Sequence, residues 1–344
     1  MDKIKLVHLD SLSCEAIFRI APNGDYVIIS QVGDVDEPAP KNRVHIFRSK
    51  DNGESWSKGE SIYPEDGRAV YLTEVAVNGQ DMYVFAQIHD GAFLDWDCVV
   101  LHSADSGYTW ENLGRVPCFE RSFVFLRSAI RLKNGGIMLS YQNYDVSDEE
   151  NERLKKEGKL IVHADLESVE TGTIVSYDEG KTFTKCKNPV YVPLTTQEGK
   201  RLWQWTEPTL MELKDGRIVM LIRINGTGFL WRSESLDGGM SWSEPIRTDI
   251  PGPNNKPKLI RLPDGRIALL NTPNSKLGLR QRYPLAVWIS DDEMETFSYK
   301  HIIADMPGAY SYSDGVPSPD GKHILFAFEF NRHDIYFVDH EIKE

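Results

Sequence analysis

A short polar turn recurs five times along this chain, and its repetition constrains the fold more than any other feature. The copies read SKDNGESW, SADSGYTW, SYDEGKTF, SLDGGMSW and SDDEMETF, and they begin at Ser49, Ser103, Ser176, Ser235 and Ser290. Each copy places Ser, Asp, Gly and Thr or Ser at alternate positions before an aromatic residue, except that Met294 replaces the glycine in the last. Ser and Asp side chains bond nearby backbone groups, and glycine supplies a positive φ. Each copy therefore predicts a turn that leads back into a packed strand.

A second repeat alternates with the first, and it is an Asn-Gly or Asp-Gly pair between two apolar runs. Such a pair is a strong signal for a tight β-hairpin. The six pairs are Asn23-Gly24, Asn78-Gly79, Asn134-Gly135, Asp215-Gly216, Asp264-Gly265 and Asp320-Gly321. Together the two repeats define a unit of four antiparallel strands, and four such strands make one propeller blade.

We therefore predict an all-β fold, a six-bladed β-propeller with four-stranded antiparallel blades. The N-terminal strand KIKLVHL is expected to complete the last blade, because closure removes the sheet edges that an open array exposes. The repeats fill the chain, so we expect one domain over residues 1–344. A charged stretch at about 145–170 interrupts the third unit. We interpret it as an insertion with a short helix, either a solvated excursion or a contact on the rim of the propeller mouth.

Composition and charge exclude several classes of protein. The formal net charge is −13, which argues against nucleic acid as a partner, because a phosphate backbone needs a basic face. No segment has the apolar length of a signal peptide or a membrane span, so we expect a cytoplasmic protein that does not bind membranes. The four cysteines lack metal-ligand spacing, and we expect buried thiols without disulfides. We expect no metal and no cofactor, with His333 and His340 exposed at strand ends, and we make no prediction about oligomeric state.

The alignment of the six units on their hairpin glycines identifies the side chains expected at one mouth of the ring, where the first strands begin. Nine residues before each glycine stand Glu15, Val70, Leu126, Glu207, Lys256 and Tyr312. Seven residues after it, Gln31 and Arg223 are the notable polar residues, and eight residues before the Ser-x-Asp turns stand Asp95 and Arg282. Two arginines near a carboxylate and a phenol predict an anionic ligand, because guanidinium groups bind carboxylates in bidentate fashion. Strand-start exposure and structural ion pairs remain the alternative explanations.

Three segments resemble the sialidase (neuraminidase) superfamily, whose members have a six-bladed propeller. They are WTEPTLMELKDGRIVMLIR, TPNSKLGLRQRYPLAVWISDD and YSDGVPSPDG, and the Ser-x-Asp turns look like the Asp boxes of that family. In that family three arginines hold the carboxylate of the substrate, a tyrosine is the nucleophile, a glutamate takes its proton and a loop aspartate is the acid and base. The resemblance implies that Arg223 and Arg282 bind a carboxylate, that Tyr312 attacks the sugar, and that Glu207 activates it.

The sequence departs from the family pattern at two positions. The first arginine of the family falls at Cys14, which Glu15 follows, and Arg19 in FRIAP is the candidate to replace it, although it lies in mid-strand. The loop QVGDVDEPAPKNR should carry the acid/base residue, and Asp36 is our candidate there, next to two other acidic residues. Asp95 is a competitor from the second unit.

Three functions remain open from the sequence. The first is a retaining glycoside hydrolase of the exo-α-sialidase type, acting on a terminal acidic sugar of a small molecule or an oligosaccharide. The second is a hydrolase on another sugar, exo-arabinanase-like or specific for a uronide, with Glu15 and Glu207 as paired carboxylates about 5 Å apart. The third is a propeller that binds carbohydrate without catalysis. In each case Trp96, Trp203 and Trp205 either stack on sugar or pack between blades.

Overall fold

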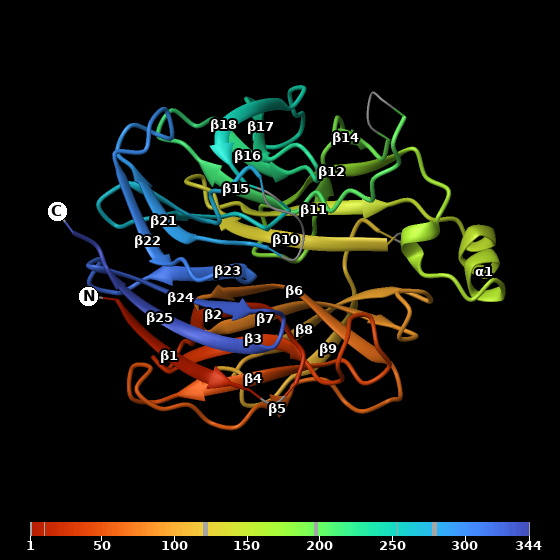
Figure 1. Cartoon of the computed structure of the whole chain (residues 1–344), viewed down its shortest axis with the longest axis horizontal. Helices are drawn as coiled ribbons and strands as arrows, with labels where there is room; N and C mark the ends of the chain where they lie inside the picture. Colours follow the sequence, from red (N-terminus) through yellow and green to blue (C-terminus); the bar gives the residue numbers. More distant parts are fainter. Residues whose placement is uncertain are drawn as a thin grey trace.

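The computed structural model describes residues 2–9, 11–119, 123–195, 199–252, 254–276 and 281–343, and within these ranges the fold is almost entirely β (Figure 1). The prediction of an all-β class is thereby confirmed. The described helices are α1 (Asp148–Lys156) and the short 3₁₀ helix η1 (Ile161–His163). Neither has the length and apolar character needed to cross a membrane.

Three sheets are four-stranded and antiparallel, with their strands in chain order from one edge to the other. The first contains β6 (Ala69–Asn78), β7 (Asp81–His89), β8 (Asp97–Ser103) and β9 (Glu111–Arg115). The second contains β15 (Pro208–Glu212), β16 (Ile218–Arg223), β17 (Phe229–Ser235) and β18 (Ile246–Pro251). The third contains β19 (Lys258–Arg261), β20 (Ile267–Asn271), β21 (Leu285–Ser290) and β22 (Tyr299–Ala304). These sheets match the predicted four-stranded unit.

The two remaining sheets are larger than the predicted unit. One has five strands: β10 (Phe123–Arg131), β11 (Ile137–Tyr144) and β12 (Ser168–Ser176), with β13 (Thr184–Lys185) and β14 (Val190–Pro193) both paired to β12. The other has eight strands. It joins the series β2 (Ser13–Ile20), β3 (Tyr26–Val32), β4 (Arg43–Ser49), β5 (Glu60–Ser61) to the series β23 (Tyr310–Pro317), β24 (His323–Phe330), β25 (Asp334–Glu341), β1 (Lys3–His8).

The eight-stranded sheet differs from the six separate sheets that the repeats predict. Its two antiparallel series meet through one parallel pair, Ile17 of β2 and Asp314 of β23, where the two first strands come close enough to bond. The pairing of β1 with β25 is antiparallel, as expected for an N-terminal strand that completes the last unit. The chain ends therefore lie near each other in Figure 1.

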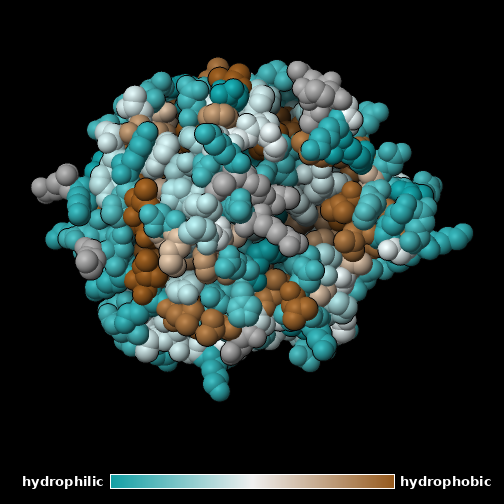
Figure 2. Space-filling model, in the orientation of Figure 1, coloured by the Kyte–Doolittle hydropathy of each residue, from teal (hydrophilic) through white to brown (hydrophobic). Residues whose placement is uncertain are grey.

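The first strands of the units form a closed ring. Each of β2, β6, β10, β15, β19 and β23 contacts the next, and β23 returns to β2. Apolar side chains fill the space between neighbouring sheets; Leu126 of β10, for example, belongs to the same buried cluster as Leu210 of β15. The face of the molecule in Figure 2 is mainly hydrophilic with separate hydrophobic patches. Because the six first strands close into a ring, their starting residues surround a common axis.

Both predicted turn types form. Each of the six Asn/Asp-Gly pairs joins a first strand to a second, and the glycines adopt φ between 61° and 91°. In the Ser-x-Asp turns the serine hydroxyl accepts the backbone N–H four residues later. Met294 keeps this bond at 2.8 Å with φ of 72°, so the turn chemistry survives the loss of the glycine.

These turns make the fold sensitive to acid, and the last turn allows a matched test. Hydrogen bonds from Thr296, and from the hydroxyl of Ser290, lower the pKa of Asp292 to about 2. Aspartate titrates near 3.9 in the unfolded chain, so this stabilisation is fully present above about pH 4 and is lost as the pH falls towards 2. We expect Asp292→Asn to lower the Tm at pH 7 by roughly 1–3 °C, and the deficit to shrink at pH 3.

The neighbouring Asp291→Asn is the control, because Asp291 is exposed and occupies the variable position of the turn pattern. Thermal unfolding followed by circular dichroism at both pH values measures the difference. Equal Tm shifts in the two variants at pH 7 would contradict this account of the turn.

The charged insertion contains the predicted short helix and is anchored to the ring. Ser147 caps α1 by accepting the backbone N–H of Glu150 at 3.1 Å. Leu154 of α1 and Ile161 of η1 are buried in one cluster with Phe93 and aromatic residues of neighbouring strands. The insertion is therefore a packed part of the molecule, on the side away from the termini (Figure 1).

Candidate functional site

A cavity of about 900 Å³ opens where the first strands begin. Its polar side is formed by Arg223 at the end of β16, Arg282 before β21, and Ser311 and Tyr312 of β23. Its apolar side is formed by Tyr71, Phe93 and Trp205, together with Leu160 and Val162 from the insertion. Acidic residues of the loop between β3 and β4 complete the rim. Of the two explanations for the insertion, a contact on the rim is the one that the structure supports.

Irregular strand starts place the key side chains on the axis. β-Bulges interrupt β2 after Cys14, β10 after Leu126 and β23 after Ser311. Glu15 and Tyr312, which stand in two of these bulges, have φ of 55° and 52°. A bulge re-aims a side chain relative to the regular alternation of a strand, so these residues point towards the axis.

Tyr312, Arg223 and Glu207 form the centre of the site. The Nη1 atom of Arg223 is ion-paired with the carboxylate of Glu207 and lies 3.4 Å from the hydroxyl of Tyr312. All three side chains are buried. Tyr312 still borders the cavity, whereas Glu207 lies behind it against the arginines. The structure thus brings Glu207, Arg223 and Tyr312 together, as the sequence led us to expect.

Burial and charge set the protonation of this centre. Burial, together with the charge of Glu207, raises the pKa of Tyr312 well above its ordinary value, so the phenol is neutral at rest. Burial by itself would raise the pKa of Glu207, but the charges of Arg223 and Arg127 outweigh it and lower that pKa below its ordinary value. A neutral phenol therefore stands near an ionised carboxylate.

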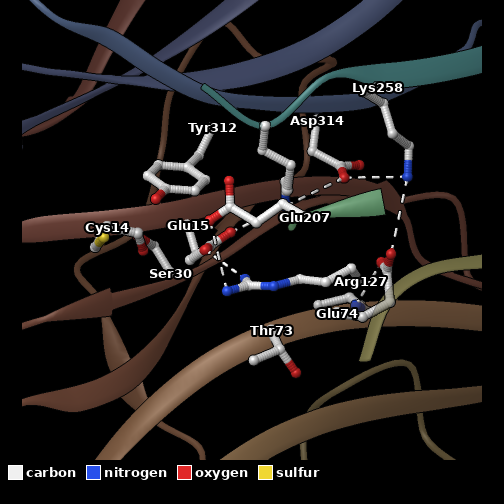
Figure 3. Close-up of polar contacts among 12 residues, drawn as sticks. Cys14, Glu15, Ser30, Thr73, Glu74, Arg127, Glu207, Lys258, Tyr312 and Asp314 are labelled. Atoms are coloured by element: carbon white, nitrogen blue, oxygen red, sulfur yellow. Dashed lines mark hydrogen bonds and ion pairs between the residues drawn. The ribbon is translucent and has the colours of Figure 1, made fainter. Parts of the chain in front are cut away.

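Arg127 is a central residue that the alignment misses. Its Nη1 lies 2.6 Å from Glu15, its Nη2 lies 3.6 Å from Glu207, and it stands between these carboxylates near the axis (Figure 3). The alignment selected its neighbour Leu126, because Arg127 in the β10 bulge lies eight rather than nine residues before the hairpin glycine. The signal was nevertheless present, since Arg127 follows the apolar run FVFL as Arg223 follows IVMLI.

Glu15 lies behind the cavity lining and is held by several donors. It is fully buried and bonds to Arg127 at 2.6 Å, the hydroxyl of Tyr71 at 2.8 Å and Lys256 at 2.9 Å. Lys256 also lies 5.8 Å from the ring centroid of Tyr312. These three donors favour a structural role for Glu15, and its pairing with Glu207 in catalysis stays a prediction.

Among the described residues, Arg282 lines the cavity without a direct ion-pair partner, although its charge contributes to lowering the pKa of Glu207. Its Nη1 donates to Ser311 at 2.9 Å, and its guanidinium lies 5.4 Å from the ring of Tyr312. No carboxylate of the described ranges is within ion-pair distance of it. The nearby Glu329 does not neutralise it fully, because burial and the charge of Glu15 raise the pKa of Glu329 to about 8. This combination favours an anionic ligand at Arg282.

Three of the predicted site residues lie elsewhere. Arg19 pairs with Glu74 and Asp314, both at 2.6 Å, and lines a second cavity of about 450 Å³. It lies too far along β2 to reach the first cavity, so Arg19 does not replace the missing arginine. Gln31 of β3 is buried and does not border the first cavity.

Asp95 also lies outside the lining of the first cavity. It is exposed and pairs with Lys155 of α1 at 2.9 Å, because a turn with positive φ directs it towards the insertion. Asp36, by contrast, is an exposed carboxylate on the rim, and Asp34 lines the same rim. Its neighbour Glu37 is ion-paired with Arg332 from the loop after β24. The rim therefore offers Asp36 as a solvent-accessible acid.

Of the three tryptophans considered, one lies at the cavity and two pack against other aromatic side chains. Trp205 borders the cavity, whereas Trp203 stacks on Tyr144 at 4.6 Å and Trp96 packs against Phe123 at 4.0 Å. The cysteine expectation holds in part: all four thiols are free, but Cys118 is exposed rather than buried.

Comparison with known proteins places the fold. The family described as BNR repeat-like domain matches residues 67–324. No curated protein matches the sequence. A Hadza microbial sialidase, Hz136, is similar in structure, with a TM-score of 0.73 and 18% identity over 96% of this chain and 66% of its own. A Dyadobacter fermentans protein of unknown function has a TM-score of 0.72 and 16% identity over 99% of this chain and 98% of its own.

Trypanosoma rangeli sialidase is also similar, with a TM-score of 0.68 and 15% identity over 97% of this chain and 55% of its own. The present chain thus spans less than two thirds of the length of either sialidase. At these identities the likeness establishes the fold, and the chemistry has to be argued from the cavity itself.

Proposed function

We propose, from the premise that this chain belongs to the BNR repeat-like domain family, that it is a retaining glycoside hydrolase acting on a terminal acidic sugar. The observation that carries the proposal is Arg282 beside Tyr312, without a direct ion-pair partner among the described residues and with the ionised Glu207 behind it. The substrate is a small glycoside or an oligosaccharide whose carboxylate is held at Arg282. Trypanosoma rangeli sialidase has been solved with sialic acid and, as a covalent intermediate, with 2,3-difluorosialic acid, which makes a sialoside the first substrate to test.

The architecture in this proposal is a six-bladed propeller in a single domain. The two four-stranded series of the eight-stranded sheet count as two blades, since one parallel residue pair joins them. The closed ring of six first strands supports this count.

The proposed reaction uses groups already poised in the cavity. The Tyr312 oxygen forms a bond to the anomeric carbon while the bond to the leaving oxygen breaks. The phenol proton passes to Glu207, whose lowered pKa keeps it able to accept, and Arg223 contacts both partners. Asp36 donates a proton to the leaving oxygen. Asp36 then takes a proton from water, which attacks the anomeric carbon and releases Tyr312 to regain its own proton.

Arg282→Met tests the recognition of the carboxylate. We expect a loss of kcat/KM of about 10²-fold on a fluorogenic α-sialoside, because the substrate anion loses its charge-assisted hydrogen bonds. Steady-state kinetics measures the effect. Arg266→Met is the control, since Arg266 binds its own neighbour Asp264 in the hairpin turn that joins β19 to β20.

A substrate whose carboxylate is replaced by a neutral amide gives the second comparison. On that substrate Arg282→Met and the parent protein should be equally slow. Unchanged kcat/KM of Arg282→Met on the acidic substrate would refute carboxylate binding at Arg282.

A further inference from the structure

The N-terminal segment carries a side-chain cluster that the proposed hydrolysis does not use. Asp2 precedes β1, His301 lies on β22 and His340 lies on β25, so the cluster joins the eight-stranded sheet to its neighbour. It lies near the chain ends, whereas the insertion that lines the large cavity lies on the other side of the molecule (Figure 1). Within the described ranges, it is the one group of three His, Cys, Asp or Glu residues found close enough to share an ion.

The contacts in the cluster converge on one carboxylate. One oxygen of Asp2 lies 2.7 Å from Nδ1 of His340, and the other lies 2.8 Å from Nε2 of His301. The two imidazole rings stack with their centroids 5.0 Å apart. Although the sequence suggested an exposed strand end, His340 is only 1% exposed. Two imidazoles therefore face the same carboxylate at a largely enclosed point.

We propose that Asp2, His301 and His340 form a binding site for a divalent transition-metal ion, of which zinc is the best match. Two imidazole nitrogens and one carboxylate oxygen are ligands that zinc takes readily, with water as a fourth. The three donor atoms lie within 4.8 Å of one another. Zinc bonds of about 2.0–2.2 Å require donors about 3.3 Å apart in a tetrahedron, so each imidazole nitrogen must move back from its Asp2 oxygen by about 0.5 Å. The carboxylate must also turn, because the two imidazoles now contact different oxygens. The partly exposed Asp2 and His301 have room for this shift.

The other nitrogen of His340 supports a defined ligand orientation. Its Nε2 lies 3.4 Å from the hydroxyl of Tyr299, also on β22. Histidines that bind metals usually engage their second nitrogen in such a contact, which fixes the ring and the coordinating atom. An ion at this point would link the N-terminal segment, β22 and β25, and so would hold the ring closed at the pairing of β1 with β25.

Zinc titration of the full chain tests the site. The protein, without a polyhistidine tag and stripped with a chelator, is titrated with ZnCl₂ by calorimetry, and its Tm is measured with and without zinc. We expect one equivalent to bind and to raise the Tm, because a ligand that prefers the folded state stabilises it. His301→Ala and Asp2→Asn should each weaken binding by at least about 10-fold and remove the zinc-dependent rise.

Two control variants isolate the cluster from other donors. His323→Ala removes an imidazole that pairs with Asp339 instead, and Cys118→Ser removes the exposed thiol. Both should bind zinc as the parent protein does. Cobalt in place of zinc should give visible absorption bands that His301→Ala lacks.

Two outcomes would overturn the proposal. One is the absence of stoichiometric binding to the parent chain, or binding that His301→Ala and Asp2→Asn leave unchanged. The other is a lower Tm in both variants together with a parent Tm that zinc does not change. In that case the cluster would be a set of imidazole–carboxylate hydrogen bonds alone.

Discussion

Tyr312→Phe is expected to abolish hydrolysis of a fluorogenic α-sialoside while the fold remains intact. The substitution removes one oxygen, the proposed nucleophile, and keeps the ring that lies 5.4 Å from the guanidinium of Arg282. We expect kcat to fall by at least about 10³-fold, since the covalent route is lost. Binding of the product sugar, measured by calorimetry, should persist because Arg282 and Arg223 are unchanged.

Tyr310→Phe is the matched control for this experiment. Tyr310 is also a buried phenol of β23, but its ring packs against Phe328 and Phe330 rather than facing the arginines. It should retain activity. Full activity of Tyr312→Phe would refute the nucleophile. If the parent chain binds the sugar but turns over no sialoside, arabinoside or uronide, the propeller is a binding module and the hydrolase proposal is wrong.

Arg127→Met is expected to cause the largest loss of stability among these substitutions. It removes the cation between Glu15 and Glu207, both fully buried, and leaves two carboxylates with fewer counter-charges. Breaking a buried pair by removing one partner lowers the free energy of unfolding by about 3–5 kcal/mol. Urea denaturation followed by fluorescence measures this change.

Arg131→Met, four residues further along β10, is the control. The Arg131 side chain is 45% exposed and pairs with Glu179 at 2.7 Å on the surface. Such pairs contribute about 0–1 kcal/mol. The loss in the free energy of unfolding should therefore be several-fold larger for Arg127→Met than for Arg131→Met. Equal losses would mean that burial of the network does not determine its contribution.

Local turn chemistry made much of the fold predictable. The six hairpins and the Ser-x-Asp turns depend on bonds within a few residues, such as that from the amide of Met294 to Ser290. The four-stranded unit and the pairing of β1 with β25 followed from counting these turns. The merging of two units through Ile17 and Asp314 did not, because that contact joins opposite ends of the chain.

The candidate site was predictable where the inward-pointing residue lies at the same distance from its turn in several units. Counting from the hairpin glycines identified Glu207, Arg223 and Tyr312, and counting from a Ser-x-Asp turn identified Arg282. It missed Arg127, which lies one residue closer to its hairpin glycine than the position counted. It included Asp95, whose carboxylate a local turn directs towards α1 and away from the cavity.

The repeating unit, its turns and the candidates for one mouth of the ring depend on spacing along single segments, so they can be predicted before any contact is known. Which charges meet depends on how distant segments pack. Glu15 is separated by 112 residues from Arg127 and by 241 from Lys256, yet it bonds to both. Closing the ring brings these side chains into one buried volume, where each charge requires a partner. Arg282 has no direct ion-pair partner among the described residues, and its guanidinium beside Tyr312 at the cavity is the basis for expecting an anionic substrate.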